Sequence, residues 1–327
     1  MTTVLGSELE HATVPRAMDT APRVWLFGDY NQAESRVVAW KTPIPKLREW
    51  YQAKVDVHAM VTNLIAKVIQ ENKISMPPNE VTGKPMFYTK PHGEFGKGDE
   101  ERELCKRVVH GSNYDMYIKR LAMTLGVSEE VAKVLYGIYH TLFPEIKRDY
   151  HGWVRDTLTK TRTIWMPDPV KFRKVFWGFG RTLDDETLRS AYSCYPQCSV
   201  GAMLSRTLYI CSNIFRFDDD EKYKDQWCAW YGPGNWDRWR ILRDHGDRSP
   251  EAILWSGMDV RLNVHDAGGI SIPNDSDLIQ WTARTWKQIG EEPIIIDPKN
   301  RERDLVIPID FKMGPSWGDQ WDLKLAA

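Results

Sequence analysis

The chain has 327 residues, of which 42% are hydrophobic, and a formal net charge of −1. This length and apolar fraction exclude an intrinsically disordered chain and are enough for one large domain or two smaller ones. The near-neutral charge excludes a chain that is basic throughout, so any nucleic-acid surface would be local and balanced by acids elsewhere.

The first element expected after an irregular lead of residues 1–20 is a short buried strand. The apolar run 24–27 ends at Gly28-Asp29, so the end of this strand presents an acid. Residues 34–40 then turn helical, and apolar residues at helical spacing predict a helix over 56–70. Residues 71–99 combine Pro, Gly and charge without a period, which is typical of a long loop.

A basic helix is expected from Glu100 onward. Arg102, Lys106 and His110 are four residues apart, so they stay on one face of that helix. Ser128, followed by two acids, predicts the start of the next helix.

The second half of the chain ends in a hairpin. Residues 160–182 are expected as a strand-loop segment and 187–210 as a long helix, while 212–257 are charged and rich in Trp. Residues 258–263 are strand-like, His265-Asp266 and Gly268-Gly269 are expected in a turn, and Ile270 starts the returning strand. This hairpin carries an acid at its tip.

The five cysteines do not form a zinc motif. Cys194 and Cys198 are four apart, which places them on one face of a helix, but no second Cys or His pair completes a ligand set. Free thiols in a reducing cytosol are therefore expected, in preference to a metal or disulfide role. The sequence has no signal-peptide core and no apolar run of about 18 residues, so no membrane span is expected.

Two strand-end acids and a basic helix together suggest nucleotidyl transfer. Asp29 and Asp266 offer hard oxygen ligands that suit a pair of Mg²⁺ ions, and a cationic helix face suits a triphosphate. Taken singly, each acid is more often a turn residue beside glycine, and the basic stripe a solvated helix face.

The three segments resemble motifs of family A DNA polymerases, the group that includes bacterial DNA polymerase I. Residues 29–36 (DYNQAESR) are similar to its Asp-Tyr-Ser-Gln-x-Glu-x-Arg, and residues 264–266 match the start of its Val-His-Asp-Glu. The series Arg102, Lys106, His110 and Tyr114 is similar to its fingers helix, Arg-x3-Lys-x3-Phe/Tyr-x3-Tyr. Residues 56–58, 125–132, 142–146 and 317–321 also resemble family segments.

The resemblance implies a role for each matching residue. Two Mg²⁺ ions would be bound by Asp29 and Asp266. The incoming dNTP would be contacted by Gln32, Glu34, Arg102, Lys106, His110 and Tyr114. Of these, Glu34 would reject a ribose 2′-OH, and Lys106 would act as general acid to the leaving pyrophosphate. Primer-template DNA would be contacted by Arg189, Gln197 and His265.

The resemblance also implies an α+β fold, a right-hand palm of antiparallel sheet and helices with helical fingers. The expected divisions are 1–40 (lead and first palm part), 41–182 (fingers), 183–211 (palm helix), 212–257 (Trp-rich insert) and 258–327 (second palm part with the hairpin). Nothing before residue 20 matches the family's thumb or exonuclease. A second polypeptide that supplies them is therefore expected, as in a split phage-type polymerase in the cytoplasm, of the host if the source is viral.

Three residues depart from the family pattern, and other functions stay open. His110 replaces Phe or Tyr, Asp115 replaces Gly, and Ala267 replaces Glu. One alternative is a non-catalytic DNA-binding or assembly subunit, against which the presence of both acids argues. A second is a minimal stand-alone polymerase. A third is a single-subunit RNA polymerase relative, against which Tyr30 and the bulky Glu34 argue. The Trp-rich insert would stack single-stranded bases, meet a partner or form a small local core.

Overall fold

A computed structural model describes residues 23–79, 82–177, 183–216, 259–300 and 304–325, and these form two compact units. Unit 1 comprises residues up to Asn31, Met203–Glu292 and Pro308 onward. Unit 2 comprises Gln32–Ala202 and Pro293–Ile307. The Trp-rich segment lies outside the described residues from 217 onward, so the prediction for it stays open.

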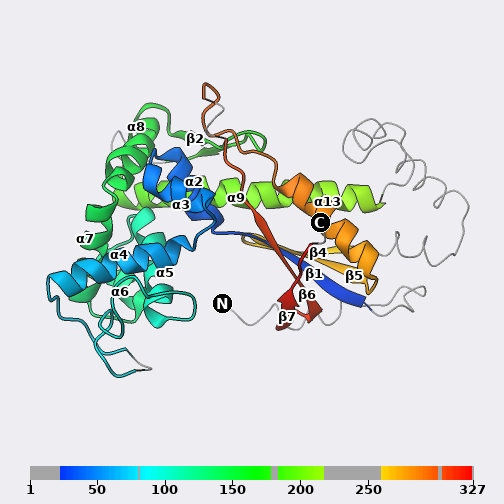
Figure 1. The fold of residues 1–327 in the computed structure, drawn as a ribbon. Helices are drawn as coiled ribbons and strands as arrows, with labels where there is room; N and C mark the ends of the chain where they lie inside the picture. Colours follow the sequence, from blue (N-terminus) through cyan, green and yellow to red (C-terminus); the bar gives the residue numbers. More distant parts are fainter. Residues whose placement is uncertain (1–22, 80–81, 178–182, 217–258, 301–303, 326–327) are drawn as a thin grey trace, which may run out of the picture. The chain divides into compact units, whose positions relative to one another are not determined.

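Unit 1 is built on a five-stranded antiparallel sheet in the order β4-β5-β1-β6-β7 (Figure 1). The strands are β1 (Arg23–Tyr30), β4 (Asp259–Val264), β5 (Ala267–Pro273), β6 (Ile309–Ser316) and β7 (Asp319–Asp322). Helix α13 (Ser276–Gly290) and the end of α9 (Asp185–Arg216) complete this unit. The prediction of an antiparallel sheet with helices is therefore confirmed.

One face of the sheet is covered by helices because two facing glycines leave room for a large ring. Gly28 and Gly268 are direct partners on β1 and β5. A Cβ atom on either would lie 2.9 Å from Cζ2 of Trp286, which α13 contributes and which is fully buried. Only glycine allows this approach. Since side chains alternate along β1, Asp29 faces away from this helix-covered side and is exposed.

Unit 2 is mostly helical. Its helices are α2 (Ala33–Lys41), α3 (Pro45–Gln52), α4 (Val57–Glu71), α5 (Glu100–Asn113), α6 (Ile118–Leu125), α7 (Glu129–Leu142), the π-helix η1 (Ile146–His151), α8 (Gly152–Thr161) and the first part of α9. A two-stranded sheet of β2 (Thr163–Trp165) and β3 (Arg173–Val175) joins them. Helix α4 packs on α5 and α7 around buried apolar side chains such as Ile65, Leu104 and Leu135.

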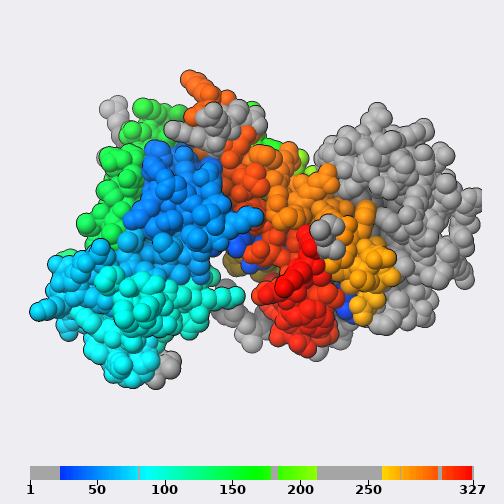
Figure 2. Space-filling view, viewed as in Figure 1, coloured from blue at the N-terminus to red at the C-terminus, as the bar shows by residue number. Residues whose placement is uncertain are grey.

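The long predicted loop between α4 and α5 is held by side chains of α4. Gln70 Nε2 donates to the carbonyl of Lys90 at 2.8 Å, and Asn63 Nδ2 donates to the carbonyl of Phe95 at 2.9 Å. Figure 2 shows α4 and this loop as one closely packed surface, in blue to cyan. Backbone carbonyls of the loop that have no helix or strand partner accept hydrogen bonds from these side chains instead.

The hairpin differs in one detail from its prediction. Gly268 and Gly269 were expected in the turn, but both lie in β5, which begins at Ala267. The turn is only His265-Asp266, and Val264 pairs with Ala267 across it. Along the part of the chain that the structure describes, no helix is long and apolar enough to cross a membrane.

Candidate active-site residues

The two predicted metal ligands lie in unit 1, Asp29 near the end of β1 and Asp266 in the turn that precedes the adjacent strand β5. Asp29 is the penultimate residue of β1 and pairs in register with Ala267, the first residue of β5. Asp266 directly precedes that residue, and its carbonyl accepts the backbone N–H of Tyr30 at 3.0 Å. The sheet therefore brings the two carboxylates, which are far apart in sequence, to the same end of neighbouring strands.

Buried hydrogen bonds fix the end of β1 beside these acids. The hydroxyl of Tyr30 donates to the carbonyl of Gly290 at 2.9 Å and contacts Thr207 Oγ1 at 3.1 Å. Burial raises the pKa of this hydroxyl, so Tyr30 stays protonated and acts as a structural donor. His265 adopts the left-handed conformation, with φ 55°, that the tight turn before Asp266 requires.

The acid pair suits Mg²⁺ by its donor chemistry. Carboxylate oxygens are hard ligands, and Mg²⁺ commonly takes only one or two of them together with substrate phosphates. Among the described residues, no group of three or more His, Cys, Asp and Glu side chains is placed to hold a metal ion. One carboxylate at the end of β1 and one in the turn before β5 therefore fit ions that are shared with a substrate, and do not fit an all-protein metal cage.

Most of the predicted nucleotide-binding residues line one open hollow of about 550 Å³ in unit 2. Two come from one face of α5, as the spacing of four predicted, one is the residue that caps the C-terminal end of α5, and one comes from α2; the wall also includes one predicted DNA-binding residue, from α9. The predicted residues in its wall are Glu34, Lys106, His110, Tyr114 and Gln197. Glu103, Arg107, Gly111, Met116 and Thr124 complete the wall.

Inside this hollow, Glu34 is held by His110 of α5 and by Tyr114, which follows the last residue of that helix. The hydroxyl of Tyr114 donates to Glu34 Oε2. His110 Nδ1 lies 3.7 Å from the same oxygen. His110, which departs from the family pattern, therefore meets an acid here. Lys106 has no hydrogen bond or ion pair among the described residues, so its ammonium group is available to an anion.

Arg102 does not line the hollow, although the spacing of four predicted that it shares a face of α5 with Lys106 and His110. Its guanidinium contacts Asp56 Oδ2 through Nε at 2.9 Å and Nη2 at 2.8 Å, and Nη1 pairs with Glu103. Asp56 also caps α4 by accepting the N–H of Ala59 at 3.0 Å. Burial would raise the pKa of Asp56, but the bonds from Ala59 and Arg102 outweigh burial, and the pKa lies below its usual value.

His58 is a neighbour of this group to which no role was assigned from the sequence. It is buried, its ring lies 5.9 Å from that of His110, and neither ring nitrogen has a partner among the described residues. Burial, and then the nearby His110 and Arg102, lower its pKa to about 3, so His58 is neutral. The Asp56-Val57-His58 segment was the sequence signal for it.

The predicted DNA-binding residues fall in different places. Arg189 Nε donates to the carbonyl of Asp115 at 2.8 Å, and its guanidinium lies 3.3 Å from the ring centroid of Tyr117. Gln197 is exposed on α9. Gln32, which was predicted to contact the nucleotide and not the DNA, precedes α2 in a left-handed conformation with φ 49°. Arg189 is thus fixed within unit 2 by its own neighbours.

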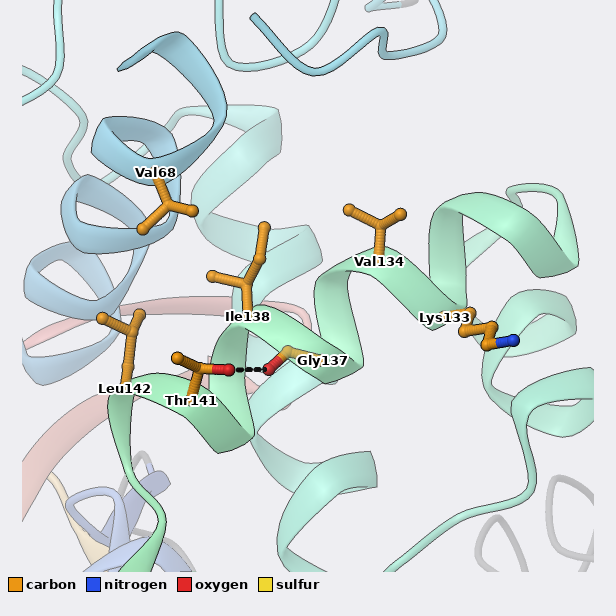
Figure 3. Close-up of a pocket in the computed structure, with 7 residues that line it drawn as sticks. All are labelled: Val68, Lys133, Val134, Gly137, Ile138, Thr141 and Leu142. Carbon is orange, nitrogen blue, oxygen red and sulfur yellow. Dashed lines mark hydrogen bonds between the residues drawn. The ribbon is translucent and has the colours of Figure 1, made fainter. Parts of the chain in front are cut away.

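A second hollow, of about 380 Å³, lies between α4 and α7 and has different chemistry. Figure 3 shows Val68, Ile138 and Leu142 around a common space, with Thr141 Oγ1 bonded to the carbonyl of Gly137 at 2.9 Å. Among the described residues that line it, Lys133 is the only ionisable one, and the others are mostly apolar.

The fold is similar to the polymerase domain of a family A DNA polymerase. The similar solved structure is the POL domain of Pol1 from M. smegmatis in complex with DNA primer-template and dNTP, with a TM-score of 0.56 and 18% sequence identity. The match covers 91% of this chain and 40% of that one. No family model and no curated protein matches the sequence. A likeness at this identity establishes the fold alone.

Proposed function

We propose that this chain is the catalytic subunit of a template-directed DNA polymerase, which transfers dNMP to a primer 3′-OH and releases pyrophosphate. The observation that carries the proposal is the pair Asp29, at the end of β1, and Asp266, in the turn before the adjacent strand β5, on a polymerase-like fold. Fold likeness alone would say little of function. The acid pair adds the chemistry that this reaction needs.

Asp29 and Asp266 would hold two Mg²⁺ ions. The bound ions would supply an activated primer hydroxyl and charge stabilisation at the transferred phosphoryl group. The contribution of the chain is to fix these carboxylates, which it does through the strand pairing of Asp29 with Ala267 and the anchored Tyr30.

The hollow in unit 2 would bind the triphosphate of the dNTP. Lys106 offers an ammonium group that forms no ion pair with any acid in the described part of the chain, and it would donate a proton to the leaving pyrophosphate. Arg102 would add its fork of donors on leaving Asp56. His110 would contact the nucleotide, and Tyr114 would pack beside the nascent base pair.

Three residues would meet the primer-template. Arg189 and Gln197 on α9 and His265 at the hairpin turn would contact the duplex near the primer end. A second polypeptide that supplies thumb and exonuclease functions stays a prediction. A chain that needs it should bind DNA weakly and lose binding at moderate salt, since phosphate contacts dominate duplex affinity.

Primer extension by the purified chain tests the proposal. Asp29→Ala and Asp266→Ala should each abolish extension while circular dichroism stays unchanged. Losing one ligand removes several kcal/mol of transition-state stabilisation, which is on the order of a thousandfold in rate. Asp322→Ala, which removes an exposed acid of β7, is the matched control and should extend normally. Extension by Asp266→Ala at near wild-type rate would contradict the proposal.

Discrimination between dNTP and rNTP tests the choice of DNA over RNA. Glu34 is fixed by Tyr114 in the hollow, where it would leave no room for a 2′-hydroxyl. Glu34→Ala should therefore raise kcat/KM for rNTP relative to dNTP. Glu103→Ala, at another acid of the same wall, should leave the ratio unchanged. Equal discrimination in all three proteins would remove the steric role of Glu34.

A further inference from the structure

Two cysteines of α9 face each other within unit 2. The Sγ atoms of Cys194 and Cys198 are 3.5 Å apart, although Cβ atoms at this helical spacing are usually about 5–6 Å apart. Both side chains therefore turn toward one another. Cys194 is buried and Cys198 is partly exposed, so a small molecule can reach the second sulfur but not the first.

The helical turn that carries this pair lacks one backbone hydrogen bond. Pro196 lies between the cysteines and has no N–H to donate to the carbonyl of Tyr192. That carbonyl instead accepts the hydroxyl of Tyr150 at 2.6 Å. A turn without its own bond at this point deforms at lower cost than a regular one.

The two thiols differ in acidity. The hydrogen bond between the two sulfurs and the attraction of Lys174 lower the pKa of Cys198 to about 7 despite burial. The same hydrogen bond, together with burial, raises the pKa of Cys194. Cys198 is therefore the attacking thiol, because the thiolate is the nucleophile and this one is accessible.

We propose that Cys194 and Cys198 form a reversible dithiol–disulfide site for small disulfides of the glutathione type. The Cys198 thiolate attacks one sulfur of glutathione disulfide, whose S–S bond breaks and releases a first glutathione thiol. Cys194 then loses its proton and attacks the Cys198 sulfur, which releases a second. The protein loses two electrons and two protons, and one glutathione disulfide becomes two glutathiones.

Closure of this bond would alter the hollow in unit 2. The sulfurs must approach from 3.5 Å to about 2.05 Å, and the turn at Pro196 would supply the movement. Gln197 lies between the cysteines and lines the hollow with Lys106 and Tyr114. This consequence rests on the proposed function: the oxidised chain should extend primers more slowly, and dithiothreitol should restore the rate.

Mass spectrometry of tryptic peptides tests the site without reference to activity. The chain is incubated with glutathione disulfide at pH 8 in a Cys228→Ser background, alkylated and digested. Both cysteines fall on peptide 190–206, while Cys105 falls on 103–106 and Cys211 on 207–216. Peptide 190–206 should lose the mass of two hydrogen atoms at least tenfold faster than the other two are modified, and dithiothreitol should reverse the change.

A matched variant fixes the order of the steps. Cys194→Ser should stop at a stable glutathione adduct on Cys198, because no second thiol remains to displace it. Absence of reaction in the Cys194-containing chain, an adduct that persists there, or equal reaction at Cys105 and Cys211 would each overturn the proposal.

Primer extension by the reduced and oxidised chain then measures the consequence. Cys198→Ser should extend equally under both conditions, whereas the chain with both cysteines should slow several-fold on oxidation. Disulfide formation with no extension in either state would refute the polymerase function and leave the dithiol site standing. Equal extension in both states, with the disulfide formed, would refute only the coupling through Gln197.

Discussion

The acid pair Asp29 and Asp266 of unit 1 and the cations Arg102 and Lys106 of unit 2 are positioned by different means. Backbone pairing places Asp29 beside Ala267, so the strand register alone sets the position of the acids. On α5, side-chain contacts decide: Arg102 turns to Asp56, while Lys106, one helical turn further along, lines the hollow and has no ion pair among the described residues. Equal spacing on a helix therefore gives two cations with different surroundings.

This difference in positioning indicates which of the two sites should keep its geometry when single residues are changed. A register that forms within a five-stranded sheet is supported by every neighbouring strand. A single ion pair such as Arg102 with Asp56 can open when a stronger anion arrives, because it is partly exposed and screened. Unit 1 should therefore resist changes that rearrange unit 2.

Among the tests of this comparison, the largest expected effect separates Arg102 from Lys106 on α5. Lys106→Ala should slow dNMP incorporation by roughly 10- to 100-fold, since a charge-assisted hydrogen bond is worth about 1.5–3 kcal/mol. Arg102→Ala should cost less, because Asp56 already holds that charge. Single-turnover extension with DNA affinity measured in parallel gives both numbers. Lys119→Ala, at an exposed cation of α6, is the control.

A reversed order would break the comparison. If Arg102→Ala were the more harmful change, the pair with Asp56 would have to open on nucleotide binding and release its fork to the phosphates. A defect in DNA affinity alone, with normal incorporation once bound, would instead place Lys106 on the path of the template.

Strands β1, β4 and β5 and several helices could be predicted from the sequence, whereas β6 and β7 were not. Apolar periodicity predicted α4 close to its observed bounds, the basic series predicted the start of α5 at Glu100, and the cap at Ser128 accepts the N–H of Val131 as expected. The acid-tipped hairpin followed from a strand pattern and a turn. These features depend on local sequence, so they could be predicted without knowledge of distant contacts.

The missed features depend on residues that are far apart in sequence. Gly268 was predicted in a turn because glycine is typical of turns, but here it admits the ring of Trp286. The bond from Arg102 to Asp56 spans 46 positions, and no local pattern encodes it. Likewise, the spacing of four along α5 predicted that Arg102 and Lys106 share a face, but not that Arg102 would form an ion pair with Asp56.

A moderate loss of stability is expected when the packing of α13 against the sheet is disturbed. Gly28→Ala or Gly268→Ala would place a Cβ atom 2.9 Å from Trp286, so each should lower the free energy of unfolding by about 1–3 kcal/mol. Gly201→Ala is the matched control, since its Cβ atom would meet nothing within 4 Å, and it should stabilise α9 by roughly 0.5–1 kcal/mol. Urea unfolding gives both values. A tolerated Gly28→Ala would mean that α13 is not held against the sheet.

The smallest expected effect concerns Asp56, whose two roles can be separated by substitution. Asp56→Ala removes both the cap of α4 and the bond to Arg102, whereas Asp56→Asn keeps a good cap and removes only the charge. Loss of the cap should cost about 1 kcal/mol. Asp56→Asn should therefore be the milder variant at pH 7 in urea unfolding.

The pH dependence of unfolding gives the sign of the charge contribution. The pKa of Asp56 is lowered in the folded chain, so its ion pair stabilises the fold above the ordinary carboxyl pKa of about 4 and is lost as the pH falls below it. The stability difference between the chain with Asp56 and Asp56→Asn should therefore shrink from pH 7 to pH 3. Asp156→Asn, at an exposed acid of α8, should show no such change. If this stability difference instead grew on acidification, Arg102 would not stabilise the ionised Asp56. The contrast between side-chain pairing in unit 2 and strand pairing in unit 1 would then no longer hold.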